Sequence, residues 1–393
     1  MGGDEINFIV QDSRGNPVRA DVLARVRTLG GDELYLDAVS DGEGLATFLL
    51  PPLSQIEYVV AASRQPGFWN LFAEDVDDFE ELVLQSLPAI DEPAWWLECL
   101  GIDSENPDRG KGIKIGVVDG DFRNGAGLEH VVQLMATEQP EPPDGWGHGE
   151  AVCRILADRD ARVGRLLSIA PAAQVVFIDA SNENDTLNED AATIAIRRLV
   201  VEEKVDIINL SWGNASPNDA IRDVLNLAAE FGVTVVAATG NEGFQSQPMY
   251  PASDPNCIGV GALGLDKWGP VGTLVEWYRK RSNDVKRQGN VPRIGQVYAW
   301  CDSTIGAGVH VLAPGVGIFV QRNGGNSFEL SGTSFASPMV CGLLAVALAA
   351  DKQYLGLPRS RGRTNYVRQA FKSMCRPVGI SKRYQGSGVP SAP

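Results

Sequence analysis

Ser334 is the residue whose type and surroundings first suggest chemistry. It stands in "LSGTSFASPM", after Gly332 and Thr333 and before an apolar stretch of helical character. Glycine lets the backbone turn and approach another chain closely, and the amides of a following helix N-terminus favour negative charge. A serine hydroxyl needs a base within hydrogen-bond distance before it can act as a nucleophile. Without that base, Ser334 is better explained as a helix N-cap.

The chain contains three histidines that could serve as the base, His130, His148 and His310. His148 stands between two glycines at the start of a short apolar helix pattern, which leaves its imidazole room to face a cleft. His310 lies in an apolar strand and His130 in a polar loop. A base histidine needs an acid that fixes its tautomer and stabilises the imidazolium. Asp119, at the end of "GIKIGVVD", fits that role, and Asp, His, Ser is one known chain order of this triad.

Alternating strand and helix patterns must position these residues. The runs "IKIGVVD", "QVVFIDA", "VDIINLSWG" and "VTVVAATGN" are typical of strands buried on both faces. Helical spacing covers residues 188–202, and a second helix is predicted to open at Ser216 and Pro217. This alternation predicts right-handed crossovers and a mostly parallel sheet. In such sheets the chemistry lies at the carboxyl ends of the strands, where Asp119 and Asn241 stand.

The N-terminal part of the chain has a different pattern. Short alternating runs separated by Gly- and Pro-containing turns predict a small β-sandwich over residues 1–88, similar to immunoglobulin-like accessory modules. We expect the α/β domain to occupy residues 89–378. The Gly-, Ser- and Pro-rich residues 379–393 are predicted to form a flexible tail.

Composition limits the classes of partner. The 393 residues carry a net charge of −16, which argues against a nucleic-acid partner. The chain has no basic leader followed by an apolar run, and no uninterrupted apolar segment of about 18 residues, which predicts a cytoplasmic protein with no membrane partner. Its six cysteines lack paired spacing, so we expect free buried thiols and no zinc site.

The motifs together resemble those of the subtilisin-like serine proteases, the subtilases. "GKGIKIGVVDGD", "GHGEAV", "VVAATGNEG" and "LSGTSFASPMVCGLLA" are similar to the family's aspartate, histidine, oxyanion asparagine and serine segments. "INLSWG", "YPASDPNCIGVGA" and "VHVLAPG" match three further segments in order. The resemblance covers residues 93–378 and implies a subtilisin-like three-layer α/β fold. It also implies a serine endopeptidase with a triad of Asp119, His148 and Ser334.

The same resemblance assigns the groups around the triad. The side-chain amide of Asn241 and the backbone N–H of Ser334 would form the oxyanion hole, and an amide donor is suited to that charge. The backbone from Ser211 through Trp212 to Gly213 would bind an extended peptide as an added strand. Two more residues would line the pocket for the residue before the scissile bond, Gly240 and Glu242. No cofactor is required, and structural calcium, frequent in the family, has no assignable ligands here.

The chain departs from the family's pattern at two motifs. Gly120 and Asp121 follow the aspartate, and Glu150 and Ala151 occupy positions that usually hold Thr and His after the glycine. None of these changes removes a catalytic atom. The alternative to an active protease is a catalytically silent or activator-dependent scaffold that binds a peptide or protein.

An insertion distinguishes this chain from compact members of the family. Residues 266–300 are basic and aromatic, with Trp268, Trp277 and Tyr278 among them. Such a segment could bind a regulatory protein, as could residues 1–88. The alternative is a self-packed surface loop that docks on the acidic N-terminal module.

Overall fold

The computed structural model of the chain divides into two compact units. The structure describes residues 4–88, 94–122, 125–136, 147–160, 166–182, 187–322 and 326–393. We call the larger one the α/β unit; it comprises Ile90–Asp266, Ser282–Val320 and Leu330–Pro393. The other is the sandwich unit, made of Met1–Ala89, Lys267–Arg281 and Gln321–Glu329.

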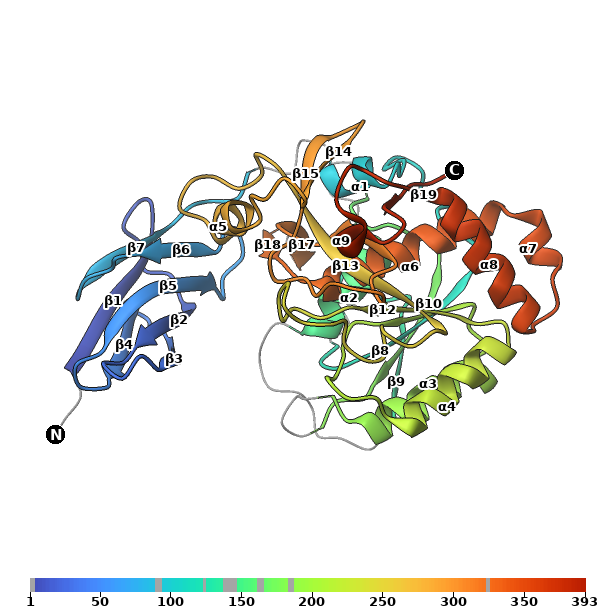
Figure 1. The fold of residues 1–393 in the computed structure, drawn as a ribbon, viewed down its shortest axis with the longest axis horizontal. Coiled ribbons are helices and arrows are strands. Elements are labelled where there is room, and N and C mark those ends of the chain that lie inside the picture. The colour runs from blue at the N-terminus through green and yellow to red at the C-terminus, as the bar shows by residue number, and fades with distance from the viewer. Residues whose placement is uncertain are drawn as a thin grey trace. The chain divides into compact units, whose positions relative to one another are not determined.

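The α/β unit is built on a nine-stranded sheet with the order β14-β15-β13-β12-β11-β8-β10-β9, in which β16 also pairs with β13 (Figure 1). The pairs β9–β10, β10–β8, β8–β11, β11–β12, β12–β13 and β13–β16 are parallel, and the pairs β13–β15 and β15–β14 are antiparallel. The strands are β8 (Lys114–Asp119), β9 (Val132–Met135), β10 (Gln174–Asp179), β11 (Ile207–Leu210), β12 (Thr234–Ala238), β13 (Cys257–Leu265), β14 (Gln288–Val291), β15 (Gly295–Ala299) and β16 (Val311–Pro314). The sequence prediction of a mostly parallel sheet is confirmed.

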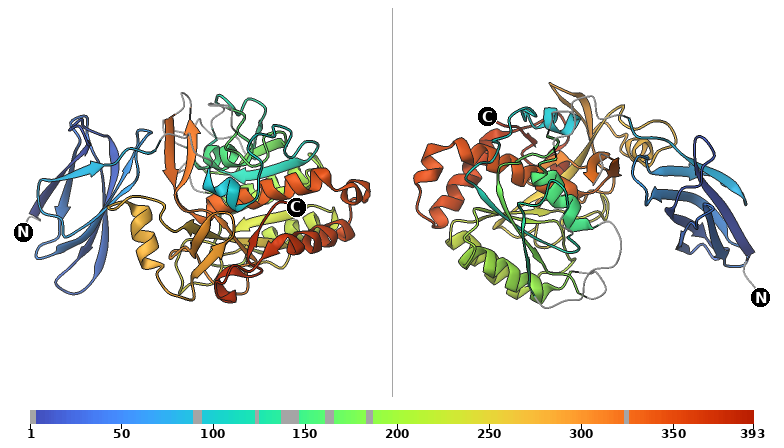
Figure 2. Two further views of the ribbon diagram at one scale, coloured as in Figure 1. Left: turned by 90° about the horizontal axis from the view of Figure 1, so that it is seen from above. Right: turned by 180° about the vertical axis from the view of Figure 1, so that it is seen from behind.

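Helices cover both faces of this sheet (Figures 1 and 2). One face carries α2 (His148–Ala157) and α6 (Thr333–Ala350), and the other carries α3 (Glu189–Val201), α4 (Asp219–Glu230) and α8 (Arg361–Met374). Shorter helices are α1 (Trp95–Cys99), α7 (Lys352–Gly356) and α9 (Lys382–Gln385). The result is the predicted three-layer α/β architecture, with apolar strand residues between the helix layers.

Two features of these helices bear on the sequence predictions: the residue at which α4 begins and the apolar composition of α6. Helix α4 begins at Asp219, not at Ser216, because the side chain of Asn218 accepts the amide of Ile221 and caps the helix there. In the described part of the chain, α6 alone has the length and apolar composition of a membrane span. That helix is 72% buried inside the protein, as expected for the central helix of a protein core.

The sandwich unit contains two sheets. One has the order β4-β1-β7 and is mixed, because β1 pairs antiparallel with β4 and parallel with β7; the other, β3-β2-β5-β6, is antiparallel. Its strands are β1 (Asp4–Asp12), β2 (Ala20–Arg27), β3 (Glu33–Val39), β4 (Leu45–Leu50), β5 (Gln55–Ser63), β6 (Leu71–Glu74) and β7 (Glu80–Leu84). Strand β2 alternates buried and exposed residues, so each sheet presents one apolar face to a shared core. Phe8 and Phe48 meet in that core, 5.9 Å apart between ring centroids. The predicted β-sandwich is confirmed.

The insertion divides between the two units. Its first part forms α5 (Leu274–Arg281), which belongs to the sandwich unit, while β14 and β15 belong to the α/β sheet. The ring of Trp277 stacks on Phe72 at 4.6 Å and lies 5.8 Å from Tyr58. Trp268 meets Trp69 edge to face at 5.7 Å. Trp268 and Trp277 of the insertion are thus packed on the N-terminal module, as expected for a surface loop that docks there.

The prediction of a flexible tail over residues 379–393 is wrong. This segment forms α9 and then β20 (Val389–Pro390), which pairs with β19 (Cys375–Arg376). Ile380, Tyr384 and Val389 are buried. The Gly, Ser and Pro content of this segment is typical of a flexible tail, but its few apolar side chains pack in the core through contacts with residues distant in sequence.

All six cysteines are free, five of them buried, as expected.

Candidate active site

Asp119 and His148 meet at the carboxyl end of β8. The Oδ1 atom of Asp119 lies 2.7 Å from Nδ1 of His148 and also accepts the amide of Gly120 at 2.9 Å. The carboxylate is almost completely buried, whereas 42% of the His148 side chain is exposed. A buried acid that holds one ring nitrogen, beside an accessible imidazole, is the arrangement a general base needs.

Two glycines fix the entry of His148 into α2. A Cβ on Gly147 would collide with the carbonyl oxygen of Asp121. A Cβ on Gly149 would stand 2.5 Å from the carbonyl oxygen of Gly120 and 2.6 Å from the ring of Phe177. The backbone on either side of the histidine therefore approaches the end of β8 more closely than any other residue type allows.

Ser334 is anchored to the end of β11. Its Oγ donates to the carbonyl oxygen of Ser211 at 3.0 Å, and its own carbonyl oxygen accepts the Ser211 hydroxyl at 2.7 Å. In a regular helix that carbonyl would accept the amide of residue 338, but Pro338 has no amide hydrogen. Proline within α6 thus releases the carbonyl of Ser334 for a contact that holds α6 against the sheet.

A buried polar chain supports this contact. Ser337 donates to Oδ1 of Asn209 at 2.8 Å, and the amide of Asn209 donates to the Ser211 hydroxyl at 2.9 Å. Asn209 and Ser337 are fully buried and Ser211 nearly so. Because buried polar groups are stable only when paired, these bonds fix the position of the first turn of α6 relative to β11.

Asn241 follows β12 and lies beside the same turn. Its Oδ1 accepts both the backbone amide of Thr333, at 3.0 Å, and the Thr333 hydroxyl, at 2.8 Å. With the oxygen occupied twice, the side-chain NH₂ group is left as a donor. The Nδ2 atom is 3.8 Å from the position that a Cβ on Gly332 would occupy, which places this donor next to the backbone that leads into Ser334.

His148 lies near the residue that follows Ser334. Its ring is 5.6 Å from the ring of Phe335, the residue after Ser334. The structure thus brings Asp119, His148, Ser334 and Asn241 to one edge of the sheet, as the strand-end rule predicts.

The predicted peptide-binding residues surround the same edge. Trp212 donates its indole N–H to the carbonyl of Val118 at 3.1 Å, which ties the segment after β11 to β8. Gly213 is exposed, and a Cβ there would stand 2.7 Å from Met249. A Cβ on Gly240 would collide with the carboxylate of Glu242, so this carboxylate lies directly over the glycine.

The helix of His148 carries buried charges, of which Glu150 but not Arg154 was noted from the sequence. Arg154 bonds to Glu150 and Asp158, at 2.8 Å each, and to the carbonyl of Ala126 at 3.1 Å. Desolvation raises the pKa of Asp158. Burial, together with the nearby charges of Asp119 and Glu150, raises the pKa of the Cys153 thiol well above its ordinary value. The thiol beneath the site is therefore neutral and unsuited to be a nucleophile.

Three contributors were missed from sequence: Thr333, Asn209 and Ser337. Thr333 stands directly before the candidate nucleophile, and Asn209 is a polar residue within the apolar run "DIINL", so a signal existed for both. For Ser337 the only signal was its position three residues after Ser334, which places both on the same face of a helix.

Across the parts of the chain that the structure describes, there is no group of three or more His, Cys, Asp or Glu side chains that could hold a metal ion.

Comparison with known proteins gives a consistent result. The model of the Subtilase family matches residues 110–388. Subtilisin DY of Bacillus licheniformis is 27% identical over 290 residues, which span 72% of this chain and 89% of that protein. Subtilisin Savinase of Lederbergia lenta is 25% identical over 291 residues, 72% of this chain and 90% of that protein.

Solved structures share the fold. Sphericase aligns with a TM-score of 0.59 at 21% identity, over 78% of this chain and 100% of that chain. The protease domain of PatA aligns with a TM-score of 0.54 at 22% identity, over 72% of this chain and 94% of that chain.

Proposed function

The chain belongs to the subtilase family and is a serine-type endopeptidase, and we propose that Asp119, His148 and Ser334 are its catalytic triad. The observation that carries the proposal is the 2.7 Å contact between the buried Asp119 carboxylate and Nδ1 of the accessible His148. This contact assigns the proton to Nδ1 and leaves Nε2 with the lone pair of a general base.

The proposed reaction follows from these positions. The Ser334 Oγ attacks the carbonyl carbon of the scissile bond while Nε2 of His148 takes the hydroxyl proton. Asn241 and the Ser334 amide stabilise the oxyanion of the tetrahedral intermediate. The C–N bond then breaks, His148 gives its proton to the leaving amine, and an acyl-enzyme remains. Water, activated by His148, hydrolyses the ester and restores Ser334. Every step uses groups of this chain, so we propose that no cofactor takes part.

The substrate is proposed to bind as an extended peptide along the backbone from Ser211 to Gly213, of which Gly213 is exposed. The carboxylate of Glu242 lies over Gly240, at the proposed pocket for the residue before the scissile bond. A negative charge at this place favours a basic residue there. Cleavage before and after the Glu242→Gln change, mapped on a mixed peptide library, tests this preference.

We also propose a regulated enzyme that acts in the cytoplasm on protein substrates, without nucleic-acid or membrane partners. The sandwich unit is the proposed docking site for a regulatory protein, because residues 1–88 and α5 form one packed module that holds none of the proposed catalytic groups. Loss of regulation, with catalysis on small peptides retained, is expected when this module is deleted. Structural calcium remains without an assigned site.

A fluorophosphonate probe tests the triad directly. We expect the full-length protein to be labelled, and labelling to disappear in Ser334→Ala. Ser216→Ala, which changes an exposed serine, is the matched control and should label normally. Absence of labelling in the wild-type protein, with or without cell extract, would overturn the proposed activity and favour a silent scaffold.

The base role of His148 has its own test. Protonation of the imidazole removes the lone pair, so kcat/KM should fall as the pH is lowered from 8 toward 5 and His148 takes up a proton. A flat profile between pH 5 and 8 would exclude His148 as the base.

A further inference from the structure

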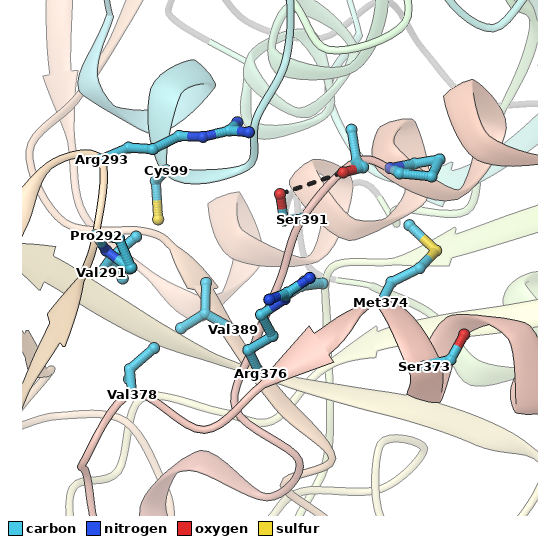
Figure 3. Close-up of a pocket in the computed structure, with 13 residues that line it drawn as sticks. Cys99, Val291, Pro292, Arg293, Ser373, Met374, Arg376, Val378, Val389 and Ser391 are labelled. Carbon is cyan, nitrogen blue, oxygen red and sulfur yellow. Dashed lines mark hydrogen bonds between the residues drawn. The ribbon is translucent and has the colours of Figure 1, made fainter.

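A cavity in the α/β unit contains none of the proposed active-site residues (Figure 3). Its volume is about 520 Å³, which is within the range of small-molecule sites. Its walls come from α1, the loop between β14 and β15, the end of α8, and the β19–β20 pair. The loop belongs to the insertion, and the last five lining residues, 389–393, follow the end of the family match at residue 388. The cavity is therefore built partly from the insertion and partly from residues that lie outside the family match.

The walls are held in place by backbone hydrogen bonds. Asn290 donates to the carbonyl of Val378 at 2.7 Å, Ser391 to that of Met374 at 3.2 Å, and Ala392 to that of Leu100 at 2.7 Å. These bonds connect β14 to the segment after β19, and the C-terminal segment to α8 and to the end of α1. The cavity is thus formed before any ligand arrives, and a ligand need not supply the free energy of ordering these segments.

The lining combines apolar walls with two cations. Val291, Val378 and Val389 supply apolar surface, together with Met374 and three prolines. The guanidinium groups of Arg293 and Arg376 also line the cavity, and no Asp or Glu does. Figure 3 shows both arginines extending from their separate elements toward Ser391. Arg293 packs over Gly101, where a Cβ would displace its guanidinium and stand 2.7 Å from the Ser391 hydroxyl.

These two arginines differ from others on the same protein. Arg363 binds Asp206 at 2.6 Å and Arg361 binds Glu230 at 2.7 Å. Arg293 and Arg376, in contrast, form no ion pair or side-chain hydrogen bond with any residue that the structure describes. The C-terminal sequence around Arg376 supplies no acidic side chain to neutralise its charge. Residues 352–393 contain nine Lys and Arg and no Asp or Glu, although the whole chain has a net charge of −16.

From this combination we infer that the cavity is a binding site for an amphipathic carboxylate. The carboxylate head would bind the guanidinium groups of Arg293 and Arg376, whose planar donors match its two oxygens. The apolar part of the ligand would pack against Val291, Val378 and Val389. A small inorganic anion would leave these apolar walls unused, and a neutral apolar ligand would leave both guanidinium groups without a counter-charge.

Calorimetric titration of the full-length protein with decanoate, below its micelle concentration, tests the site. We expect one decanoate per chain, and binding at least about tenfold weaker for acetate, which has the head without the chain, and for decanol, which has the chain without the charge. Arg293→Ala/Arg376→Ala should weaken decanoate binding at least about tenfold. Lys372→Ala removes a nearby exposed charge that does not line this cavity and should leave decanoate binding unchanged.

Equal decanoate affinity in the double arginine variant and in Lys372→Ala would overturn the assignment, and so would acetate binding as tightly as decanoate. Both arginines are exposed, so their replacement is not expected to unfold the protein. If thermal melting shows otherwise, Val378→Glu provides a second test, since it places a competing carboxylate on the apolar wall. That variant should also lose decanoate binding, and unchanged binding would reject the site.

Discussion

The two units of this protein bury their strands differently. In the sandwich unit, β2 alternates buried and exposed residues, and its core side chains are almost all apolar. In the α/β unit, β11 and β12 are buried along their whole length, and β8 nearly so. Polar residues are buried together with these apolar ones, at the strand ends in Asp119 and Ser211, and inside the sheet in Asn209. A polar group is kept in such a place only if something pairs with it, and here the partners are the groups of the proposed site.

The units also differ in how the chain assembles them. The strand ends of the α/β unit bring together residues as far apart as 119 and 334 by a regular parallel order. The sandwich unit, in contrast, is completed by two segments that interrupt the α/β unit in sequence, Lys267–Arg281 and Gln321–Glu329. The backbone of Gly67 donates to the carbonyl of Ser327 at 2.7 Å, and that of Leu274 to Asn70 at 2.8 Å. Residues 1–88 are therefore not a complete domain, which matters for any experiment that removes them.

If the α/β unit alone carries out catalysis, replacing the oxyanion donor Asn241 should have the largest effect on kcat among the changes compared below. Asn241→Ala is expected to reduce kcat by about 10²–10³-fold with little change in KM, a magnitude known from subtilisin rather than worked out for this chain. Asn256→Ala, an asparagine bonded to Asn226 and Asp254 away from the site, is the control and should leave kcat unchanged. A kcat loss below about threefold in Asn241→Ala would remove this residue from the proposed reaction.

A substitution in the sandwich unit should have the opposite result, a loss of stability without a loss of activity. Trp277→Ala removes the stack on Phe72 and the contact with Tyr58, and we expect it to lower the free energy of unfolding of this unit by about 2 kcal/mol. Activity on a short peptide should stay at the wild-type level. Hydrogen exchange resolved by segment measures the first effect, and peptide hydrolysis the second. Val271→Ala, at a 77% exposed position in the same segment, should change neither.

A smaller effect should distinguish positioning from reaction within the site. Thr333→Val removes the hydroxyl that binds Oδ1 of Asn241 but leaves the backbone amide in place. We expect kcat to fall about tenfold, with Thr333→Ser restoring most of it, because serine keeps the donor. In the Asn241→Ala background, the same Thr333→Val change should have no further effect on kcat. Additive losses in the double variant would show that Thr333 acts independently of Asn241.

Sequence predicted the parallel sheet and the strand-end site because both depend on local patterns. Continuous apolar runs mark strands buried on two faces, and a polar residue that ends such a run is visible without any structure. The sequence did not reveal the order of residues 379–393 or the division of the insertion between the units. Both depend on which distant surface a segment covers, as when β20 pairs with β19 or Trp277 stacks on Phe72.

The start of α4 shows the same limit on a smaller scale. Ser216 and Asn218 are both good capping residues, and local preference alone does not choose between them. The choice depends partly on Glu189, whose carboxylate accepts the side-chain amide of Asn218 at 2.7 Å. A residue 29 positions away thus helps to fix the helix start.

The smallest expected effect is a loss of folding stability at low pH, which should occur in the α/β unit and not in the sandwich unit. All three histidines belong to the α/β unit, and none lies in the segments of the sandwich unit. Burial, aided by the charge of Arg159, lowers the pKa of His130 to about 4. Both of its ring nitrogens are buried and lack a hydrogen-bond partner among the described residues.

Since this pKa is below the ordinary histidine value of about 6.5, the unfolded chain takes up the proton first. The α/β unit should therefore lose stability as the pH falls from about 7 toward 4, with no further loss from this group below that range. His130→Gln should reduce the loss between pH 7 and pH 5 without abolishing it, because the pKa of His310 is also lowered by burial. Hydrogen exchange at the two pH values, corrected for the intrinsic rate, measures both units in one sample. If the sandwich unit lost as much protection as the α/β unit, the acid sensitivity would not come from the histidines.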